Sequence, residues 1–211
     1  MGIPESTVRA IGTTRGLDVL ELGCGAAHWS ITLVEGGARW VGLDQSRGQL
    51  AHARRAQVGG ATAFPLVCAS GEAVPFADAS WNLVFCDHGA MSFCDPKHSV
   101  GEAWRVLRPG GLLVFKKAAI MRYLTWNDAK DRTSRKLHAP YFRSNRYDSD
   151  GTIDFQIPYG EWIRLFRRHD LVVEDLIELR APKRATTTYQ GWDASRARRW
   201  PAEEIWKVRK S

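Results

Sequence analysis

The stretch "DVLELGCGAAHWS", Asp18–Ser30, decides how this sequence folds. Its short apolar run predicts a buried β-strand, and the carboxylate of Glu21 stands near the end of that run. Gly23 and Gly25 then predict a tight turn, because glycine adopts backbone dihedrals barred to other residues and lets a ligand approach the main chain. A helix over residues 27–34 follows. This order of strand, turn and helix indicates a ligand held against the backbone of the turn.

Strand-like and helix-like segments alternate along the rest of the chain. The predicted strands cover residues 17–22, 39–43, 63–69, 81–86, 112–116, 171–179 and 205–208. The predicted helices cover residues 27–34, 46–57 (with Ser46 as N-cap), 100–107 and 160–169. Short right-handed crossovers would lay these strands into a doubly wound, mostly parallel sheet, so the sequence predicts an α/β fold.

The composition is that of an ordinary globular domain. Of the 211 residues, 44% are hydrophobic and 25% are charged, and neither a membrane-spanning run nor a secretory leader pattern is visible. Cysteines 24, 68, 86 and 94 form no C-x-x-C pair, which predicts reduced thiols, a cytoplasmic location and no metal site. The net charge of +7 raises nucleic acid as a partner, although the basic residues are spread along the chain.

A second acid helps to define the expected ligand. Asp44 closes the second predicted strand, 23 residues after Glu21, where a carboxylate can accept both hydroxyls of a ribose. The third glycine of a dinucleotide-binding turn is missing, because Ala26, Ala27 and His28 follow Gly25. Glu21 also places negative charge beside the turn, which would oppose a pyrophosphate and favour an ammonium group. These features favour S-adenosylmethionine over a nicotinamide dinucleotide.

Four segments carry a resemblance to a known family. They are "DVLELGCGAAHWS", "VGLDQS", "ASGEAVPFADASWNLVFCDHGAMSF" and "RVLRPGGLLVF", in this order between Leu17 and Phe115. Together they resemble the class I S-adenosylmethionine-dependent methyltransferases, in the small-molecule branch of the ubiquinone and menaquinone C-methyltransferases. The segment "PYGEWIRLFRRHDLVVEDLIELR" resembles the following helix and strand of that family more loosely. The resemblance implies a Rossmann-like seven-stranded sheet with an antiparallel last strand and an insertion after the fifth strand.

The resemblance also implies roles for residues at the ends of the strands. Residues implied at the methionine end of the cofactor are Glu21, Gly23, Cys24 and Gly25. Asp44 would hold the ribose with Gln45 beside the adenine, and the residues implied around the adenine ring are Ser70, Gly71 and Glu72. Cys86, Asp87 and His88 would stand beside the reactive methyl group. Two positions depart from the family, since Ala27 replaces its third glycine and Ser70 replaces an acid.

We expect a single methyltransferase domain over residues 1–211. Residues 12–117 would form the cofactor-binding half, 118–158 an insertion that covers the acceptor, and 159–211 the closing helix and strands. The basic segment 181–199 predicts a loop. The chain begins about fifteen residues before its first strand, where relatives carry covering helices. A lid is therefore expected from the insertion, unless the site is open.

Methyl transfer from a sulfonium is a direct displacement, so the protein must chiefly align the reactants and exclude water. His88 is the first candidate for a general base or acceptor orienter, with Asp87 beside it and His138 and Tyr141 in the insertion as further candidates. The aromatic residues of the insertion predict either a pocket for a planar, aromatic or heterocyclic acceptor or ordinary packing; they are Trp126, Tyr141, Phe142, Tyr147 and Phe155.

Several functions compete on this reading. The first is a methyltransferase for a small molecule, directed at an O, N or C nucleophile. The second is a tRNA or rRNA methyltransferase, which the basic charge favours; against it, the fourth strand ends Cys-Asp-His-Gly and lacks the Asn/Asp-Pro-Pro-aromatic sequence of base-amino methyltransferases. A protein that binds S-adenosylmethionine without turnover and a nicotinamide dehydrogenase are the remaining alternatives. The sequence does not predict an oligomeric state.

Overall fold

The computed structural model describes residues 3–34, 36–58, 63–142, 146–149, 151–186 and 194–211. The strands are β1 (Asp18–Leu22), β2 (Arg39–Asp44), β3 (Leu66–Cys68), β4 (Trp81–Asp87), β5 (Leu107–Ala118), β6 (Trp126–Asn127), β7 (Arg132–Thr133), β8 (Arg146–Ser149), β9 (Thr152–Phe155), β10 (Leu171–Leu179) and β11 (Glu203–Lys210). The helices are α1 (Glu5–Val8), α2 (His28–Val34), α3 (Arg47–Gln57), α4 (Ala90–Phe93), α5 (Pro96–Val106), α6 (Ile120–Leu124), α7 (Tyr159–Arg168) and α8 (Ala194–Ala197), with a 3-10 turn at Asp128–Lys130.

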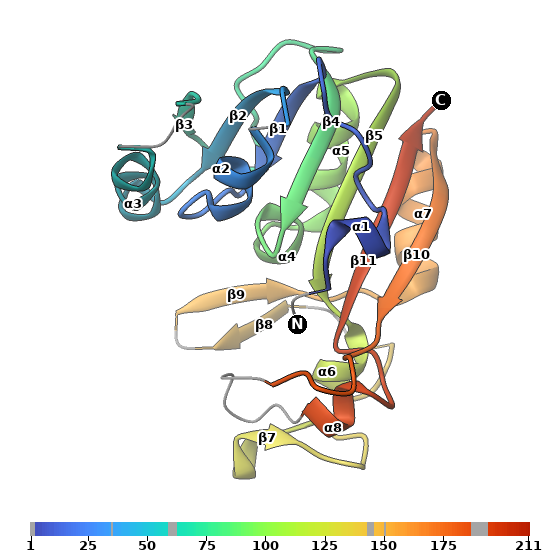
Figure 1. Ribbon diagram of the computed structural model, residues 1–211. Helices are drawn as coiled ribbons and strands as arrows, with labels where there is room; N and C mark the ends of the chain where they lie inside the picture. Colours follow the sequence, from blue (N-terminus) through green and yellow to red (C-terminus); the bar gives the residue numbers. More distant parts are fainter. Residues whose placement is uncertain (1–2, 35, 59–62, 143–145, 150, 187–193) are drawn as a thin grey trace.

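A single seven-stranded sheet forms the centre of the molecule, in the order β10-β11-β5-β4-β1-β2-β3 (Figure 1). The pairs between neighbours from β5 to β3 are parallel, whereas β11 is antiparallel to both β5 and β10. The chain builds outward from β1 through β2 and β3 and then returns to place β4 on the other side of β1. The expected α/β fold with an antiparallel last strand is confirmed, and its topological switch point lies between β1 and β4.

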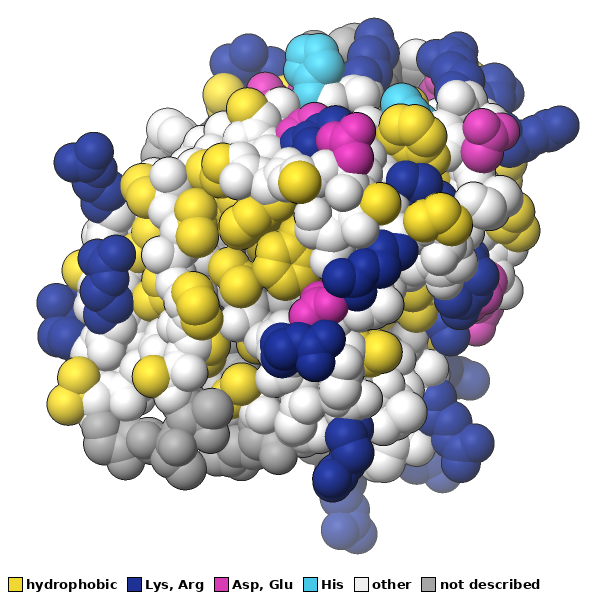
Figure 2. All heavy atoms as spheres, turned by 90° about the horizontal axis from the view of Figure 1, so that it is seen from above, with side chains coloured by type: hydrophobic (Ala, Val, Ile, Leu, Met, Phe, Trp, Pro, Cys, Tyr) yellow, Lys and Arg dark blue, Asp and Glu magenta, His cyan; other side chains and the backbone are white. Residues whose placement is uncertain are grey.

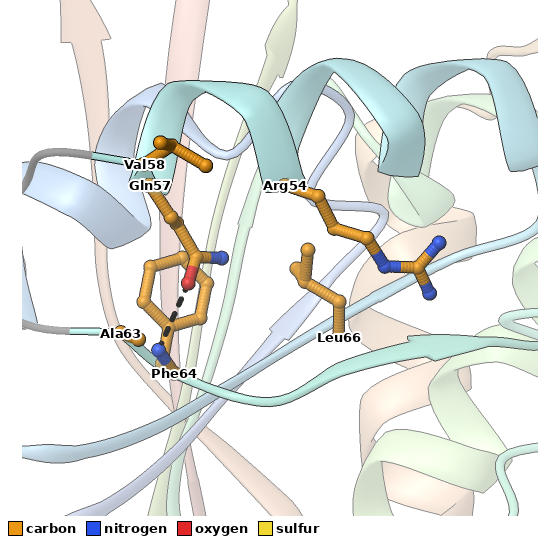
Figure 3. A pocket seen from close by; sticks show the side chains of 6 residues that line it. All are labelled: Arg54, Gln57, Val58, Ala63, Phe64 and Leu66. Atoms are coloured by element: carbon orange, nitrogen blue, oxygen red, sulfur yellow. Dashed lines mark hydrogen bonds between the residues drawn. The ribbon is translucent and has the colours of Figure 1, made fainter.

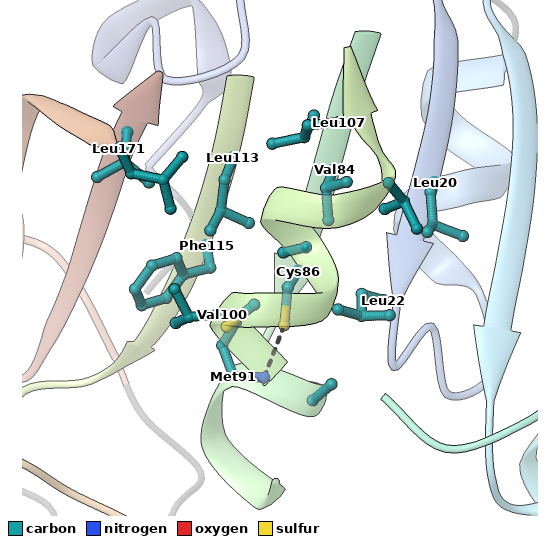
Figure 4. Close-up of a cluster of buried hydrophobic side chains, with 14 of the residues drawn as sticks. Leu20, Leu22, Val84, Cys86, Met91, Val100, Leu107, Leu113, Phe115 and Leu171 are labelled. Atoms are coloured by element: carbon teal, nitrogen blue, oxygen red, sulfur yellow. Dashed lines mark hydrogen bonds between the residues drawn. The ribbon is translucent and has the colours of Figure 1, made fainter. Parts of the chain in front are cut away.

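Both faces of the sheet are buried, as the apolar strands require. On one face, side chains such as Leu20, Val84 and Phe115 pack with Cys86 and Met91 under α4, α5 and α7 (Figure 4). The alternate residues of the same strands face α2, α3 and the N-terminal segment; they include Val19, Leu83, Phe85, Val114 and Ile205. Because both faces of the sheet are covered, a ligand would reach it at the ends of the strands.

Several predicted elements differ from the observed ones. The strand expected over residues 112–116 runs from Leu107 to Ala118. The helix expected from residue 100 begins at Pro96, because Asp95 caps it by accepting a 2.9 Å hydrogen bond from the Lys97 amide. β3 is shorter than the predicted 63–69, since this edge strand pairs with β2 over three residues alone. The expected loop 181–199 contains the turn of helix α8, which the bond from Ala181 N to Ala197 O and a small alanine cluster hold in place.

Two glycines bring the turns after β1 and β4 into direct backbone contact at the switch point. A Cβ atom on Gly89 would lie 2.3 Å from the carbonyl oxygen of Gly23 and 2.6 Å from that of Leu22. Gly23 has φ +81°, and a Cβ there would lie 2.4 Å from the Ala90 amide nitrogen. This approach fixes the relative position of the two turns that border the candidate site.

We expect Gly89→Ala to lower the free energy of unfolding by about 3 kcal/mol, because the added methyl group meets main-chain atoms that cannot move aside. Gly48→Ala is the control. It adds the same methyl group within α3, where the nearest atom lies 3.7 Å away, and should raise stability by up to about 1 kcal/mol. Urea unfolding of both variants checks this, and equal stabilities would contradict the inferred contact.

Candidate active site

The glycine turn after β1 is tied to the end of β2. The amides of Gly23 and Cys24 both donate to the Leu43 carbonyl, at 2.7 and 2.9 Å. The Gly25 amide donates to Oδ2 of Asp44 at 2.8 Å. Sequence reasoning placed these residues at neighbouring strand ends, and the structure brings them into one hydrogen-bonded unit.

Asp44 is fixed by main-chain donors. Its Oδ1 accepts a 2.7 Å bond from the Ser46 amide, while Oδ2 accepts from Gly25. Each carboxylate oxygen has a second lone pair, so both can still accept a hydrogen bond from a ligand hydroxyl. Gln45 lies beside it on the exposed side of the turn. Two main-chain donors thus fix the position of this carboxylate at the end of β2.

Glu21 is nearly inaccessible behind the glycine turn, with 2% of its surface exposed. The hydroxyl of Ser30, in α2, donates to its carboxylate. Burial is the largest influence and raises the pKa of Glu21 to about 8, and the negative charge of Asp87 acts in the same direction. Glu21 is therefore a carboxyl group that ionises readily once a cation arrives beside it.

This raised pKa predicts a pH-dependent stability. The folded protein holds the Glu21 proton up to about pH 8, while the unfolded chain releases it near the ordinary pKa of 4.5. The stabilisation is therefore complete below pH 4.5 and is lost as the pH rises through 8. Relative to Glu21→Gln, the free energy of unfolding of the wild type should fall by about 3 kcal/mol between pH 5 and pH 8. Urea titrations at both pH values test this, and a constant difference would refute it.

The segment expected near the adenine ring is held by local contacts. Ser70 Oγ accepts from the Glu72 amide at 3.1 Å, and Glu72 Oε1 accepts from the Asp95 amide at 2.7 Å. Gly71 is buried, and a Cβ on it would lie 2.5 Å from the Ala90 Cβ. This glycine lets the segment approach the start of α4 closely. Contacts of Ser70, Gly71 and Glu72 with a cofactor stay a prediction.

A polar cluster lies at the carboxyl end of β4. The polar cluster consists of Trp29, Asp87, His88, Lys116 and Glu203. Asp87 Oδ1 lies 2.9 Å from Lys116 Nζ, and Asp87 Oδ2 accepts a hydrogen bond from Trp29 Nε1. His88 Nε2 lies 2.8 Å from Glu203 Oε1, and Lys116 Nζ lies 3.8 Å from the same oxygen. The cluster joins two predicted residues to three that the sequence did not single out.

Two features of the polar cluster point to a functional role. His88 has φ +51°, a conformation that non-glycine residues adopt at a cost and that often marks functional positions. Burial would raise the pKa of Glu203, but the hydrogen bond from His88 and the charge of Lys116 outweigh it and lower that pKa to about 2. An ionised Glu203 can accept a hydrogen bond and cannot donate one. In the neutral imidazole, His88 Nε2 therefore carries the proton and Nδ1 carries the lone pair.

The other predicted site residues lie elsewhere. The Cys86 thiol points into the core and accepts from the Met91 amide at 3.4 Å, and burial raises its pKa to about 12 (Figure 4). His138 Nε2 lies 2.7 Å from Ser134 Oγ, within the insertion. The Tyr141 hydroxyl accepts from the Tyr159 amide at 3.1 Å. Neither residue hydrogen-bonds to the polar cluster in the described part of the chain.

A hydrogen bond from the end of β5 connects the insertion to the central sheet. Lys117, which is fully buried, donates a 2.8 Å hydrogen bond from Nζ to the Phe155 carbonyl at the end of β9. The insertion aromatics pack in pairs: the ring centroids of Tyr123 and Tyr147 are 4.9 Å apart and those of Tyr141 and Phe142 are 5.0 Å apart. Three of the five insertion aromatics thus have an aromatic neighbour, although Phe142 is 88% exposed.

Two hollows of the described structure differ in their relation to the site. One of about 290 Å³ lies between the end of α3 and the start of β3, and its lining is Arg54, Gln57, Val58, Ala63, Phe64 and Leu66 (Figure 3). None of these six residues is a carboxylate, a histidine or a thiol. The other, of about 120 Å³, lies between the N-terminal segment and the sheet and includes Asp87, Lys116 and Glu203 in its wall. The second hollow therefore adjoins the polar cluster.

The net positive charge is concentrated in two segments. Residues 120–142 and 180–200 contain eleven Lys and Arg and three Asp and Glu, a net charge of +8 against +7 for the whole chain. The bond from Ala119 N to Ala202 O joins the two segments next to the carboxyl end of β5, where α6 and α8 lie in Figure 1. At the opposite end of the molecule, Lys and Arg side chains are spread around the rim with hydrophobic side chains between them (Figure 2).

Of the helices in the described residues, none has both the length and the apolar character that crossing a bilayer requires.

Comparison with known proteins connects this geometry to a family. Residues 20–115 match the methyltransferase domain family. A demethylmenaquinone methyltransferase of Clavibacter sepedonicus is 33% identical over 109 residues, 52% of this chain and 44% of that protein. A malonyl-acyl-carrier-protein O-methyltransferase of Enterobacter lignolyticus is 36% identical over 127 residues, 60% of this chain and 49% of that protein. The chain thus spans about half the length of the curated relatives it matches.

A solved structure matches along the whole chain. The S-adenosylmethionine-dependent methyltransferase from Mesorhizobium loti superposes with a TM-score of 0.80 and 21% identity, and the match covers 99% of each chain. At this identity the likeness shows the fold. Residues 20–115 thus match a methyltransferase domain. The chain as a whole has the fold of the S-adenosylmethionine-dependent methyltransferases.

Proposed function

We propose that this protein transfers the methyl group of S-adenosylmethionine to a small-molecule acceptor by direct displacement. The observation that carries the proposal is the Asp44 carboxylate, which the Gly25 and Ser46 amides hold at the switch point of the sheet. Relatives named as methyltransferases of demethylmenaquinone and of malonyl-acyl-carrier protein support the choice of a small acceptor.

The cofactor would lie across the ends of β1, β2 and β4. Asp44 would accept the ribose hydroxyls and Gln45 would flank the adenine. The turn Gly23–Gly25 would border the methionine end, where the cofactor's ammonium group would convert Glu21 to its ionised form. Because Glu21 has a pKa of about 8, binding at pH 7 would release a proton. The site thus matches a ligand with a cationic end and no phosphate.

His88 would remove the proton of an acceptor that begins as an O–H or N–H group. Its Nδ1 carries the free lone pair, because the ionised Glu203 holds the proton on Nε2. Glu203 would act as a positioning residue, fixing the tautomer and the ring orientation and stabilising the imidazolium that forms. Asp87, held by Lys116 and Trp29, would shape the wall between the cofactor and the acceptor. Alignment of nucleophile, methyl carbon and sulfur would supply the remaining rate enhancement.

Calorimetric titration with S-adenosylhomocysteine tests the cofactor assignment, and a screen of phenols, amines and heterocycles with radiolabelled S-adenosylmethionine tests the transfer. We expect micromolar binding and label transfer to at least one acceptor class. Binding without transfer across the panel would instead indicate a non-catalytic S-adenosylmethionine-binding protein. Binding of NADH in place of S-adenosylhomocysteine would refute the assignment of S-adenosylmethionine as the cofactor.

A second candidate function follows from the charge of residues 120–142 and 180–200. Their net charge of +8 beside the strand ends would suit the phosphates of tRNA or rRNA. Binding of tRNA with a steep decline between 50 and 200 mM salt, together with label transfer to it, would favour this reading over a small acceptor.

A further inference from the structure

The hollow beside the polar cluster is enclosed by elements far apart in the sequence. Its roof is the N-terminal segment, which contributes Ile3, Val8 and Ile11, and its floor is the sheet, including Phe85, Val114 and Ile205. Its volume is about 120 Å³. An apolar cavity of about 150 Å³ holds a benzene molecule, so this smaller one has room for no more than a single ring.

The roof is closed by one side chain. Glu5 Oε1 accepts hydrogen bonds from the Ile11 amide at 2.7 Å and the Gly12 amide at 3.0 Å. These bonds bring residues 5 and 11–12 together, and Val8 of α1 lies in the wall of the cavity. This cavity is covered by the N-terminal segment, whereas a cover from the insertion over the acceptor stays a prediction.

One end of the cavity is polar. Trp29, Asp87, Lys116 and Glu203 all contribute to its wall, and His88 is bonded to Glu203. Asp87 ends β4, whose Phe85 pairs with Glu21 of β1, so this end adjoins the proposed cofactor site. A molecule in the cavity would therefore place one edge near the transferable methyl group and the rest among apolar side chains.

The charges of the polar end restrict what can bind. Asp87 and Glu203 are both paired with Lys116, and Glu203 also with His88. An acceptor with its own carboxylate or phosphate would bring a further negative charge into an apolar space without a free cation in this cluster, which is costly. A neutral ring with an O–H or N–H group could instead donate a hydrogen bond to the cluster and find apolar walls around its ring.

We infer that this cavity is the acceptor pocket, and that it takes a neutral, single-ring phenol or hydroxylated heterocycle whose hydroxyl points to the polar cluster. This inference rests on the proposed methyl transfer and adds the substrate class. Transfer balances without a further reagent: the phenol oxygen forms the bond to the methyl carbon as the carbon–sulfur bond breaks. The phenol proton passes to the polar cluster, in which His88 is bonded to Glu203 of the cavity wall, and S-adenosylhomocysteine leaves as a neutral thioether.

Phenol and benzoate are suitable probes, titrated by calorimetry into the protein saturated with S-adenosylhomocysteine. We expect phenol to bind at least tenfold more tightly than benzoate. Val8→Trp, which fills the cavity from its roof, should weaken phenol binding at least tenfold and leave S-adenosylhomocysteine affinity unchanged. Thr7→Trp is the matched control, because residue 7 lies exposed on the same helix and should leave both affinities unchanged.

Each outcome decides the inference. If Val8→Trp binds phenol as the wild type does, or if benzoate binds as tightly as phenol, the pocket assignment is wrong. If Val8→Trp lowers the melting temperature, Val8→Phe repeats the test with less added volume. Absence of S-adenosylhomocysteine binding in the wild type would instead overturn the proposed function, so the two failures are distinguishable.

Discussion

Replacing Asp44 with alanine is expected to weaken S-adenosylhomocysteine binding by about 100-fold or more. Each ribose hydroxyl would donate to a carboxylate oxygen, and a hydrogen bond to a charged group contributes about 1.5–3 kcal/mol. Two such bonds correspond to a factor of about 10² to 10⁴, since 1.4 kcal/mol is tenfold. Isothermal titration measures the change directly.

The control must separate ligand contacts from the shape of the turn, because Asp44 also accepts from the Gly25 and Ser46 amides. Ser46→Ala removes the side chain that caps α3 and leaves the Ser46 amide in place. It should cost about 1 kcal/mol of stability and leave cofactor affinity within twofold of the wild type. Unchanged affinity in Asp44→Ala would remove the ribose assignment and, with it, the main support for the cofactor site.

The second large effect is expected at His88. In a reaction with a phenolic acceptor, His88→Ala should lower kcat by a factor of about 10² to 10⁴, the usual contribution of a general base. Glu203→Gln keeps the shape of its partner but loses the charge that holds the proton on Nε2, so it should lower kcat about tenfold while KM for the acceptor stays within threefold. Steady-state kinetics of both variants checks these values.

His52→Ala serves as the control for His88→Ala, because His52 lies exposed on α3 and outside the polar cluster. Its kcat should equal that of the wild type. A higher pH should restore part of the activity of His88→Ala, because hydroxide ionises the phenol in place of the missing base. A kcat for His88→Ala within threefold of the wild type would show that His88 is not the general base.

The fold was predictable because its signals are local. Apolar runs ended by glycine or by an acid mark the parallel strands, and Ser46 marks the start of α3 through the cap that the structure contains. The missed start of α5 also had a local signal, since Asp95 followed by Pro96 is a typical N-cap and first helical residue. The predicted boundaries were wrong where pairing between strands determines them. The length of β3, for example, depends on its pairing with β2.

The site was predictable only in part, because three of the five residues of the polar cluster come from other parts of the sequence. His88 follows a recognisable strand, but Glu203 lies 115 residues further along the chain and reaches it through the pairing of β11 with β5. Trp29 comes from α2, is 36% exposed and donates a hydrogen bond to Asp87. Ala27, in place of the family's third glycine, adopts φ +60°, so the backbone keeps the glycine-like conformation that the residue type had put in doubt.

The position of β11 has a consequence for how the protein acquires activity as it folds. This strand inserts between β5 and β10, and its first residue is the partner of His88. A refolding intermediate that has assembled β1 to β5 but has not yet added β10 and β11 would bind nucleoside and, without Glu203, turn over slowly. During refolding, full catalytic activity should thus return later than the helical circular dichroism signal. The delay would report when β11 joins the sheet.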